Sequence, residues 1–355
     1  MVTDLMSAIG LSNIWDLQTF DPNEQIRGCG SREAIKERMP ARLSSYRLLI
    51  KRQFDDLFPE NSNPAVVVRR YFRKARVGDE RRIMKVVLFC GGLGLRIRDS
   101  EDIPKPMVKI GNRPILWHVM RYYAHFGHKE FILCLGYQAE TIKNYFVNYS
   151  EYVSNDFVLA DGGKRLELFN SDIQDWRITF LDTGINSNIG QRLKVAEKHL
   201  EGEEEFLANY SDGLTDLPLS QQLDHFHRLD KVASFLCVRP NLSYHMVSLR
   251  EDNRSLVTGM HAMNKCTLRI NGGFFIFKKK IFDYIGENED LVSEPFDRLV
   301  AKEQLVAYSY DGFWQSMDTF KDRQLLENAY ASGRAPWKLW GANCNGHLAP
   351  EVGKF

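Results

Sequence analysis

A short apolar run that breaks abruptly into glycine constrains this chain more than any other feature. Val86 to Cys90 has the length and the β-branched content of a buried strand, and Gly91, Gly92 and Gly94 follow it. Glycine lets the backbone turn sharply and leaves no Cβ beside a ligand, so the amide N–H groups of such a turn can point at an anion. The stretch therefore predicts a strand that ends at an anion-binding turn.

Cationic side chains follow this turn in the same loop. Arg96, Arg98 and Lys105 supply guanidinium and ammonium groups, which pair readily with phosphate oxygens. The alternative is an ordinary turn between a strand and a helix, with its charges in solvent.

Two well-known glycine motifs are excluded. A P-loop ends in Gly-Lys-Ser or Gly-Lys-Thr, which the stretch lacks, so a Walker-type ATPase is disfavoured. A dinucleotide-binding fingerprint needs a third glycine where this chain has Ile97, followed at once by a helix, whereas residues 99–106 carry charges and two prolines. The glycine turn therefore opens into a long basic loop of another kind.

From Lys85 onward, apolar runs of strand length alternate with amphipathic stretches of helical length. The predicted strands are 86–90, 131–135, 177–181, 206–210, 233–238, 269–277 and 305–310. The predicted helices are 115–126, 139–149, 191–200, 220–229, 279–284, 294–302 and 320–332. This order predicts an α/β fold with a Rossmann-like, mostly parallel sheet that is covered by helices on both faces. We expect it to fill one domain, residues 84–355.

Residues 1–83 differ from the rest and are predicted to form a helical N-terminal extension with a basic linker. Ser31 to Phe58 has apolar residues at helical spacing, interrupted by Pro40. Arginine and lysine are then frequent in residues 69–82, next to two aromatic residues. Such a stretch is typical of a solvated helix face or linker, and contact with a membrane surface, a nucleic acid or a neighbouring subunit is the alternative.

The composition indicates a cytoplasmic enzyme. Of the 355 residues, 44% are hydrophobic and 26% are charged, and the formal net charge of +1 lacks the basic excess of a nucleic-acid-binding protein. The six cysteines show neither a C-x-x-C pair nor zinc-ligand spacing, as in proteins of a reducing compartment. No run approaches the ~20 apolar residues of a membrane helix, and the N-terminus lacks the order of a secretion signal. We therefore expect no nucleic-acid partner and no membrane insertion.

Polar or glycine-rich residues mark several of the predicted strands at one end. These segments are 91–105, 182–184 leading to 190–192, 210–213, 271–273 and, after a fifth strand, Asp318. Ligands of open α/β sheets lie at the carboxyl ends of the strands. The sequence therefore predicts that these segments line one pocket.

Asp212-Gly213 and Asp318 are the candidate metal ligands of this pocket. A carboxylate supplies the hard oxygen that Mg²⁺ prefers, and glycine beside it leaves room for phosphate. Since Mg²⁺ takes one or two carboxylates and completes its shell with phosphate oxygens and water, Asp318 is the natural second ligand. An aspartate that caps a helix or a turn is the alternative for each position.

Eleven blocks of sequence, in order from Met84 to Lys338, resemble sugar-1-phosphate nucleotidylyltransferases, and among these most closely the glucose-1-phosphate cytidylyltransferases. The blocks are GGLGLR (91–96), PKPM (104–107), PILWHVMRYYAHFG (114–127), LGYQAETIKNYFVNY (135–149), LDTG (181–184), RLK (192–194), YSDGLTD (210–216), INGGFFIF (270–277), Glu294-Pro295, DGFWQSMDT (311–319) and SGRAPWK (332–338). The resemblance implies a nucleotide-diphospho-sugar transferase fold.

The resemblance also implies an activity and residue roles. A sugar 1-phosphate oxygen would attack the α-phosphorus of CTP, or of another NTP, to form an NDP-sugar and pyrophosphate, with Mg²⁺ as cofactor. Family members are usually homo-oligomers, which we expect here as well. The implied roles are catalytic for Arg96 and Lys105, nucleotide-binding for Gly91, Gly92, Gly94, Gly190, Arg192 and Ser211, substrate-binding for Asn271, Gly272, Gly273 and Glu294, and metal-binding for Asp212 and Asp318.

This chain departs from the family pattern at a few positions. Leu95 stands where the family usually has threonine, and Ile103 precedes Pro104 where a lysine is usual. The Glu-Lys pair that holds the sugar and its phosphate in the family aligns with His261 and Ala262. Ser211 replaces a glycine. The nucleotide half of the predicted site is therefore mostly kept, and the sugar half is altered.

Two other functions are the alternatives to transfer. One is a catalytically weak or inactive relative that binds nucleotide or sugar nucleotide in a regulatory or scaffold role, although Asp212 and Asp318 are both retained. The other is a glycosyltransferase, which would be expected to carry Asp-x-Asp at a strand end, where this chain has Asp212-Gly213-Leu214.

Overall fold

The structure is a computed structural model that describes residues 83–92, 103–240, 245–252, 255–263 and 268–341. The predicted N-terminal helices and basic linker lie outside these residues, as do Gly94 and Arg96 of the glycine loop. Within the described residues, no helix is long and apolar enough to cross a membrane.

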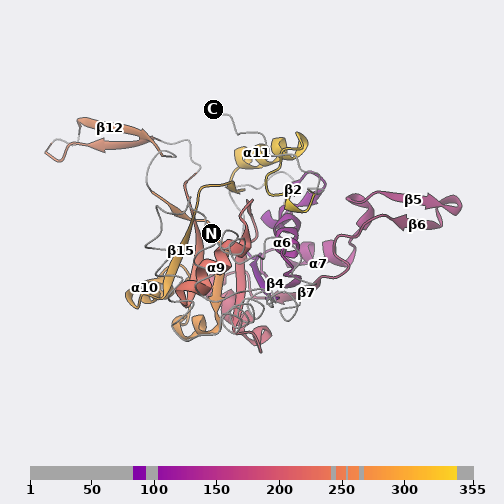
Figure 1. The fold of residues 1–355 in the computed structure, drawn as a ribbon, viewed down its shortest axis with the longest axis horizontal. Helices are drawn as coiled ribbons and strands as arrows, with labels where there is room; N and C mark the ends of the chain where they lie inside the picture. The colour runs from indigo at the N-terminus through magenta and orange to yellow at the C-terminus, as the bar shows by residue number, and fades with distance from the viewer. Residues whose placement is uncertain (1–82, 93–102, 241–244, 253–254, 264–267, 342–355) are drawn as a thin grey trace, which may run out of the picture. The chain divides into compact units, whose positions relative to one another are not determined.

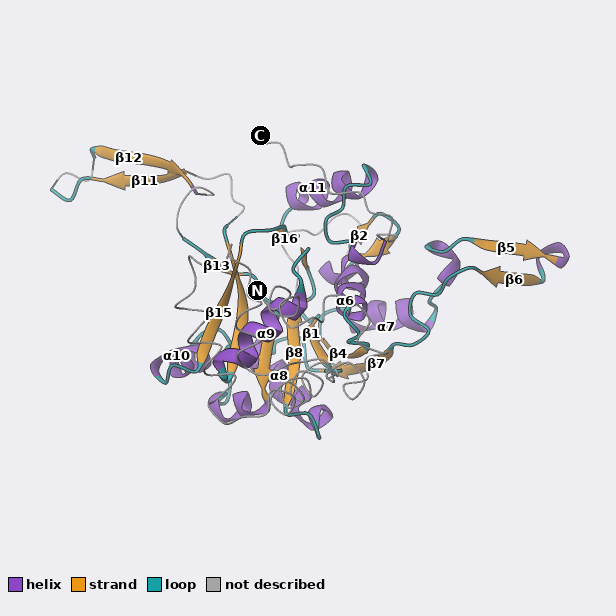
Figure 2. Cartoon of the chain, in the orientation of Figure 1, coloured by secondary structure: helices purple, strands orange, loops and turns teal. Residues whose placement is uncertain are grey.

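An eight-stranded sheet forms the centre of the fold (Figures 1 and 2). Its strands follow the order β13-β10-β14-β8-β1-β4-β7, and β15 pairs with β10. The bounds are β1 Val86–Phe89, β4 Glu130–Leu135, β7 Arg177–Asp182, β8 Glu205–Tyr210, β10 Ala233–Val238, β13 Ile270–Asn271, β14 Phe275–Lys278 and β15 Leu305–Tyr310. The β8-β1-β4-β7 half is parallel, whereas β14 runs antiparallel to both β8 and β10.

Alternate residues of β1 enter two hydrophobic cores, one on each face of the sheet. Val86 and Leu88 belong to one core, and Val87 and Phe89 belong to the other. All four are buried, which is why the strand is a continuous apolar run rather than an alternating one.

The first core lies beneath α6 (Ile115–His125), α7 (Ala139–Val147), α9 (Leu219–Leu229) and α11 (Phe320–Ala331). Helix α6 is the most buried of them, because nine of its eleven residues are buried and only two reach further into solvent. Pro114 precedes it in the extended conformation that suits an N-cap.

The second core lies beneath α8 (Ile189–Ala196) and α10 (Glu294–Ala301). Asn188 caps α8 in a capping box with Gln191, and its side chain accepts from the Gln191 amide at 2.9 Å. A 3₁₀ segment at Lys279–Tyr284 completes this face with Ile281, Phe282 and Tyr284. The helices therefore cover both faces of a mostly parallel sheet, which confirms the predicted fold class.

The predicted strand at 269–277 is broken at its middle, so that prediction was wrong in detail. Leu236 of β10 accepts a hydrogen bond from the Gly272 amide and donates one to the Gly273 carbonyl, so two residues face one in a bulge. Gly273 and Phe274 have positive φ angles of 77° and 49°. The bulge separates β13 from β14.

Four small antiparallel pairs lie outside the central sheet, and the sequence analysis did not predict them. Their strands are β2 Lys109–Ile110 with β3 Arg113–Pro114, β5 Phe157–Ala160 with β6 Arg165–Leu168, β9 Gly213–Thr215 with β16 Trp314–Ser316, and β11 His245–Leu249 with β12 Val257–Ala262. Each strand is at most six residues long, and the β9–β16 pairing joins segments that are far apart in the sequence.

Candidate active site

The glycine turn after β1 packs directly on a buried arginine. A Cβ at Gly91 would lie 1.9 Å from Nη1 of Arg192, so a side chain at this position would displace the guanidinium. A Cβ at Gly136, after β4, would lie 2.8 Å from the Gly91 carbonyl oxygen. Gly92 is exposed, and a Cβ there would meet no described atom within 4 Å. The turn is therefore closed on its sheet side and open on its solvent side.

Arg192 joins the carboxyl ends of three neighbouring strands and is only 4% exposed. Its Nη1 donates to the Leu135 carbonyl at 2.9 Å and to the Thr183 hydroxyl at 2.6 Å, and its Nη2 donates to the Gly91 carbonyl at 3.1 Å. The guanidinium thus supports the glycine turn from inside the fold. Direct contact between Arg192 and a nucleotide stays a prediction.

Lys105 links the two predicted metal ligands. Its Nζ lies 2.5 Å from Oδ2 of Asp212 and 2.8 Å from Oδ1 of Asp318. The three side chains are 14%, 25% and 35% exposed, respectively, so the cluster is shielded from solvent without being sealed. Two carboxylates from distant parts of the chain therefore converge on one cationic group.

The β9–β16 pair explains how Asp212 and Asp318 meet. Gly213 is paired with Ser316 in the antiparallel register, and the Met317 amide donates to the Asp212 carbonyl at 2.9 Å. Asp212 thus precedes one strand of the pair at the end where Asp318 follows the other. Ser316 also donates from Oγ to Oδ2 of Asp318 at 2.8 Å, which fixes the orientation of that carboxylate.

Lys105 reaches the two aspartates from a rigid segment. Pro104 and Pro106 restrict the backbone on either side of it, and Lys105–Met107 forms a 3₁₀ turn. Met107 enters the core beneath α6. The side chain of Lys105 is therefore held at the site by a buried anchor two residues away.

Charge around Lys105 favours its protonated form. Burial alone would lower the pKa of the Lys105 amine, but the carboxylates of Asp212 and Asp318 outweigh that effect and raise the pKa above its ordinary value. Lysine has one positive charge and the two aspartates have two negative charges, so the cluster has a net negative charge that favours a further cation.

The Asn271–Gly273 turn adjoins the same β-pair. The Gly272 carbonyl accepts from Nε1 of Trp314, in β16, at 2.9 Å. The Asn271 side chain accepts from the Gly273 amide at 2.9 Å, and a Cβ at Gly273 would lie 2.4 Å from Oδ1 of Asn209. The segment predicted to bind substrate is thus held beside the strand that leads to Asp318.

Three other predicted site residues have different surroundings. Ser211 is buried and donates from Oγ to the Phe89 carbonyl at 2.9 Å, which ties β8 to β1. Gly190 is buried in the first turn of α8, where a Cβ would lie 2.3 Å from the Glu289 carbonyl oxygen. Glu294 is exposed in the first turn of α10, near Arg298. The binding roles of these residues stay predictions.

The sequence analysis missed the side chains that hold the site together. Asn209 is 1% exposed, and its Oδ1 accepts from the amides of Tyr210 and Phe274, both at 2.9 Å. Asp216 accepts from the Tyr310 hydroxyl at 2.6 Å and from the Phe313 amide at 2.8 Å, which closes the loop before β16. Asp216 is the last residue of the YSDGLTD block, and its place in that block was the sequence signal that could have identified it as part of the site.

The Asp212–Asp318 pair could hold a magnesium ion whose other ligands are phosphate oxygens and water. Within the described residues, no group of three or more His, Cys, Asp or Glu side chains could hold a metal. Two carboxylates suffice for Mg²⁺ when phosphate oxygens and water complete its octahedral shell. These two already share one cation, the Lys105 ammonium, so their spacing suits a common ligand.

Comparisons with known proteins find glucose-1-phosphate cytidylyltransferases among the most similar sequences. No family model matches the chain. The glucose-1-phosphate cytidylyltransferase of Salmonella typhimurium is 36% identical over 264 residues, which cover 72% of this chain and 100% of that protein. The enzyme of the same name from Salmonella typhi is also 36% identical over 264 residues, with the same coverage.

A solved structure shows the same fold at low sequence identity. A UDP-glucose pyrophosphorylase complexed with UDP-glucose superposes with a TM-score of 0.52, at 16% identity, over 71% of this chain and 100% of that one. This likeness shows the fold, and the sequence matches above show that the chain is a nucleotidyltransferase enzyme. The chain therefore belongs to the glucose-1-phosphate cytidylyltransferase family of sugar-1-phosphate nucleotidyltransferases.

Proposed function

We propose that this enzyme transfers a cytidylyl group from CTP to a sugar 1-phosphate, with Mg²⁺ bound by Asp212 and Asp318. The observation that carries the proposal is the convergence of these two carboxylates on one cation, at the carboxyl end of the strand beside β1. The names of the Salmonella relatives support CTP as the nucleotide and glucose 1-phosphate as an acceptor to test first. A cytoplasmic location stays a prediction.

The proposed reaction needs positioning and charge neutralisation rather than a protein nucleophile. An oxygen of the sugar 1-phosphate attacks the α-phosphorus of CTP, the bond from that phosphorus to the bridging oxygen breaks, and pyrophosphate leaves with the electron pair. When bound, Mg²⁺ neutralises negative charge on the phosphate oxygens. The NDP-sugar and pyrophosphate together contain every atom of the two substrates.

The protein's own groups have separate tasks in this proposal. The Lys105 ammonium has three N–H donors, and those that Mg²⁺ displaces from Asp212 and Asp318 become available to phosphate oxygens. Gly92, on the solvent side of the turn, leaves its backbone open to the triphosphate, and Arg96 extends that contact as a prediction outside the described residues. Gly272 and Gly273 are buried, so the partly exposed Asn271 is the residue of this segment that contacts the acceptor in the proposal.

A substrate panel tests the proposal. Pyrophosphate release is measured with CTP, UTP or dTTP, each against several sugar 1-phosphates, in the presence of Mg²⁺. We expect turnover with CTP and its loss in Asp318→Asn, whereas Asp175→Asn, which removes an exposed carboxylate paired with Lys129, leaves turnover unchanged. Turnover with UTP or dTTP alone would refute the cytidylyl assignment. Nucleotide binding without pyrophosphate from any acceptor would instead favour a regulatory or scaffold role.

A further inference from the structure

Phe274 has an unusual backbone conformation for a buried aromatic residue. Its φ angle of 49° lies in the left-handed region, which a bulky side chain enters only at a cost in free energy. The other described non-glycine residues with positive φ are polar and exposed or partly exposed, whereas Phe274 is buried. Strained residues of this kind persist where the surrounding structure fixes them, and they gather at functional sites. Phe274 directly follows the Asn271–Gly273 segment of the candidate site.

Two buried carboxamide side chains fix the peptide groups on either side of the Phe274 Cα. Oδ1 of Asn209, in β8, accepts from the Phe274 amide at 2.9 Å. Nε2 of Gln222, in α9, donates to the Phe274 carbonyl at 2.7 Å. Asn209 is 1% exposed and Gln222 is 0% exposed, so both bonds lie in surroundings that strengthen them. Together they set the directions of the N–H and C=O groups of Phe274, and with them its left-handed conformation.

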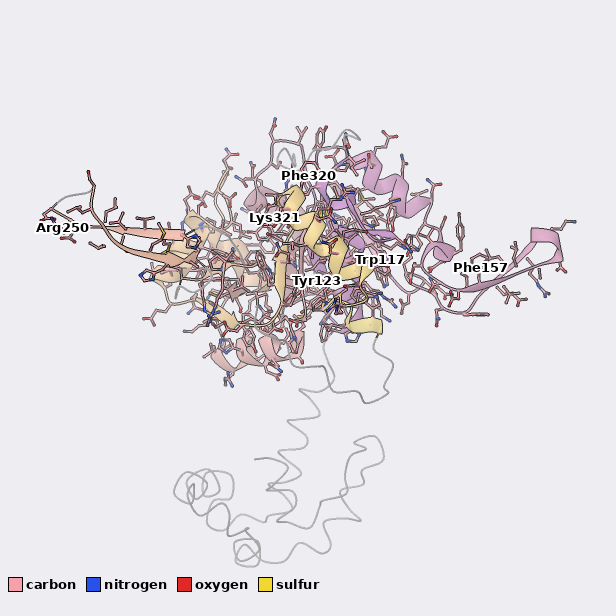
Figure 3. The ribbon with its side chains drawn as sticks, turned by 90° about the horizontal axis from the view of Figure 1, so that it is seen from above. Trp117, Tyr123, Phe157, Arg250, Phe320 and Lys321 are labelled. Carbon is pink, nitrogen blue, oxygen red and sulfur yellow. The ribbon has the colours of Figure 1, made fainter. Side chains whose placement is uncertain are left out.

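The side chain of Phe274 is anchored as well. The ring of Tyr122 packs edge-on against it, with the ring centroids 5.3 Å apart, and the ring of Tyr123 lies 6.0 Å away. Both tyrosines are buried in α6, and Figure 3 shows Tyr123 among the crowded side chains of the central domain. Three elements that are separate in the sequence, α6, β8 and α9, therefore hold this one residue.

Gln222 occupies a position in α9 that the helical pattern assigns to an apolar residue. The buried residues of this helix are Leu219, Gln222 and Phe226, at the spacing of one helical face. An apolar side chain of similar size would leave no polar atom unpaired there, whereas Oε1 of Gln222 has no hydrogen-bond partner in the described part of the chain. The bond to the Phe274 carbonyl is therefore what distinguishes Gln222 from an apolar residue at this position.

Oδ1 of Asn209 also joins the two halves of the candidate site. The same oxygen accepts from the Tyr210 amide at 2.9 Å, two residues before the proposed metal ligand Asp212. Phe274, its other donor, lies three residues after Asn271, which contacts the acceptor in the proposed function. One buried oxygen thus holds the backbone of the metal-binding segment against the backbone of the acceptor segment.

Hydrogen bonds between Phe274 and Asn271 carry this constraint along the turn. Leu236 accepts from the Gly272 amide and donates to the Gly273 carbonyl, both at 2.8 Å. The Asn271 side chain accepts from the Gly273 amide at 2.9 Å. The Gly273 carbonyl and the Phe274 amide belong to one planar peptide group. A rotation at Phe274 therefore turns that group, breaks these bonds and displaces Asn271.

We propose that Asn209 and Gln222 are positioning residues for the acceptor. By fixing Phe274, they hold the Asn271–Gly273 turn in the conformation that presents Asn271 to the sugar 1-phosphate. This role rests on the proposed function, which supplies the acceptor. Neither side chain touches a substrate, since each acts through the backbone of Phe274. Asn209 has the wider effect, because it also fixes the Tyr210 amide in the segment that leads to Asp212.

Gln222→Met tests the positioning role, because it keeps the size of the side chain and removes the donor. We expect the KM for the sugar 1-phosphate to rise about tenfold, while the KM for CTP stays within about twofold of wild type. Gln222→Glu should restore a KM near the wild-type value at pH 6, where its buried carboxyl is protonated and can donate to the same carbonyl. Ser234→Ala, which removes a buried hydroxyl from β10, is the matched control and should change neither KM.

Asn209→Leu tests whether Asn209 also acts on the metal-binding segment. We expect it to raise the KM for the sugar 1-phosphate and also the Mg²⁺ concentration needed for half-maximal turnover, whereas Gln222→Met should leave the Mg²⁺ dependence unchanged. Thermal unfolding confirms that each variant is folded at the temperature of the assay. An Asn209→Leu enzyme with the wild-type Mg²⁺ dependence would overturn the link between the two segments.

Hydrogen–deuterium exchange tests the positioning of the turn without turnover. In Gln222→Met, peptides that cover residues 270–275 should exchange about tenfold faster or more, while peptides of β1 exchange as in wild type. Unchanged exchange at 270–275, an unchanged KM for the acceptor or an equal rise in the KM for CTP would overturn the proposal. A wild type that releases no pyrophosphate with any acceptor would instead count against the proposed function, and the exchange rates would still decide whether Gln222 holds the turn.

Discussion

Two groups of charged side chains in this enzyme each join a basic residue to aspartate, and they differ in burial and in net charge. Arg113 and Asp172 form a one-to-one pair whose side chains are 4% and 7% exposed. Lys105, Asp212 and Asp318 form a one-to-two cluster that is 14%, 25% and 35% exposed. The first is a closed, neutral anchor, whereas the second is negative and reachable from solvent.

The difference indicates which group has a ligand to bind. Hydroxyl and backbone donors surround the Arg113–Asp172 pair, among them the Tyr149 hydroxyl at 2.8 Å from Oδ2 of Asp172. A buried pair of this kind is costly to break, because the remaining charge would lose its partner in a medium that solvates it poorly. The Lys105 cluster has a carboxylate in excess and is partly exposed, so a divalent cation can take the place of the ammonium between the two carboxylates.

Asp212→Asn should give the largest effect, because it should reduce turnover strongly and leave stability almost unchanged. Loss of a metal-binding carboxylate removes charge neutralisation in the transition state, and we expect turnover to fall by roughly 10³-fold. The side chain is partly exposed, so the midpoint of urea unfolding should barely move. Steady-state pyrophosphate release and urea titration measure the two effects. A variant that keeps its turnover would remove Asp212 from the proposed chemistry.

Asp172→Asn is the same chemical change in the buried pair. It should reduce stability and leave turnover almost unchanged. It leaves the Arg113 guanidinium buried without a counter-charge, and we expect a loss of about 3 kcal/mol in the free energy of unfolding. Turnover at a temperature where the variant is folded should stay within about twofold of wild type. If the unfolding free energy is unchanged, the pair is not the anchor that its burial indicates.

The fold was predictable because the strands and helices of the central domain have strong local patterns. Residues Ala233–Val238, all apolar except Ser234, match a strand of the structure residue for residue. The β5–β6 hairpin was missed because its strands are short and largely exposed. The β9–β16 pair was missed because its strands are three residues long and residues 213–215 find residues 314–316 only through the tertiary fold. The break at 272–274 depends on a bulge against Leu236, which no local pattern encodes.

The site was predictable only in part, for a related reason. Asp212 and Lys105 could be placed together because strand ends of a parallel sheet meet at one edge. Arg192 has the residue type of a phosphate ligand, yet its donors are turned inward to the carbonyls of Gly91 and Leu135. That orientation depends on three strands meeting, so the sequence alone could not distinguish support of the turn from contact with a ligand.

His118 is expected to make the free energy of unfolding depend on pH in acid solution. Burial, together with the positive charges of Lys338 and Arg113, lowers the pKa of His118 from 6.5 to about 4. Between pH 6.5 and 4 the unfolded chain therefore takes up a proton that the folded chain does not, and this residue's contribution to stability falls by up to about 3 kcal/mol as the pH drops. Above pH 6.5 it contributes no pH dependence.

Urea titrations of wild type and His118→Gln across this pH range measure that contribution. Glutamine can still donate to the Ile110 carbonyl, which lies 2.9 Å from Nε2 of His118, but it does not titrate. The difference in unfolding free energy between the two proteins should change between pH 6.5 and 4 and be constant above that range. A constant difference throughout would mean that folding does not shift the pKa of His118.

Lys105→Met should have the smallest effect of these variants, a change in metal affinity. It removes the one positive charge of the cluster. The Lys105 ammonium occupies the space between Asp212 and Asp318, so a metal ion without nucleotide has to displace it. We expect Mn²⁺, measured by electron paramagnetic resonance without nucleotide, to bind Lys105→Met about tenfold more tightly, or roughly 1.4 kcal/mol. Lys129→Met, which frees only the exposed Asp175, is the matched control and should not change the affinity. Unchanged or weaker Mn²⁺ binding in Lys105→Met would mean that lysine and metal do not compete, and that Lys105 holds the two carboxylates in place for the ion.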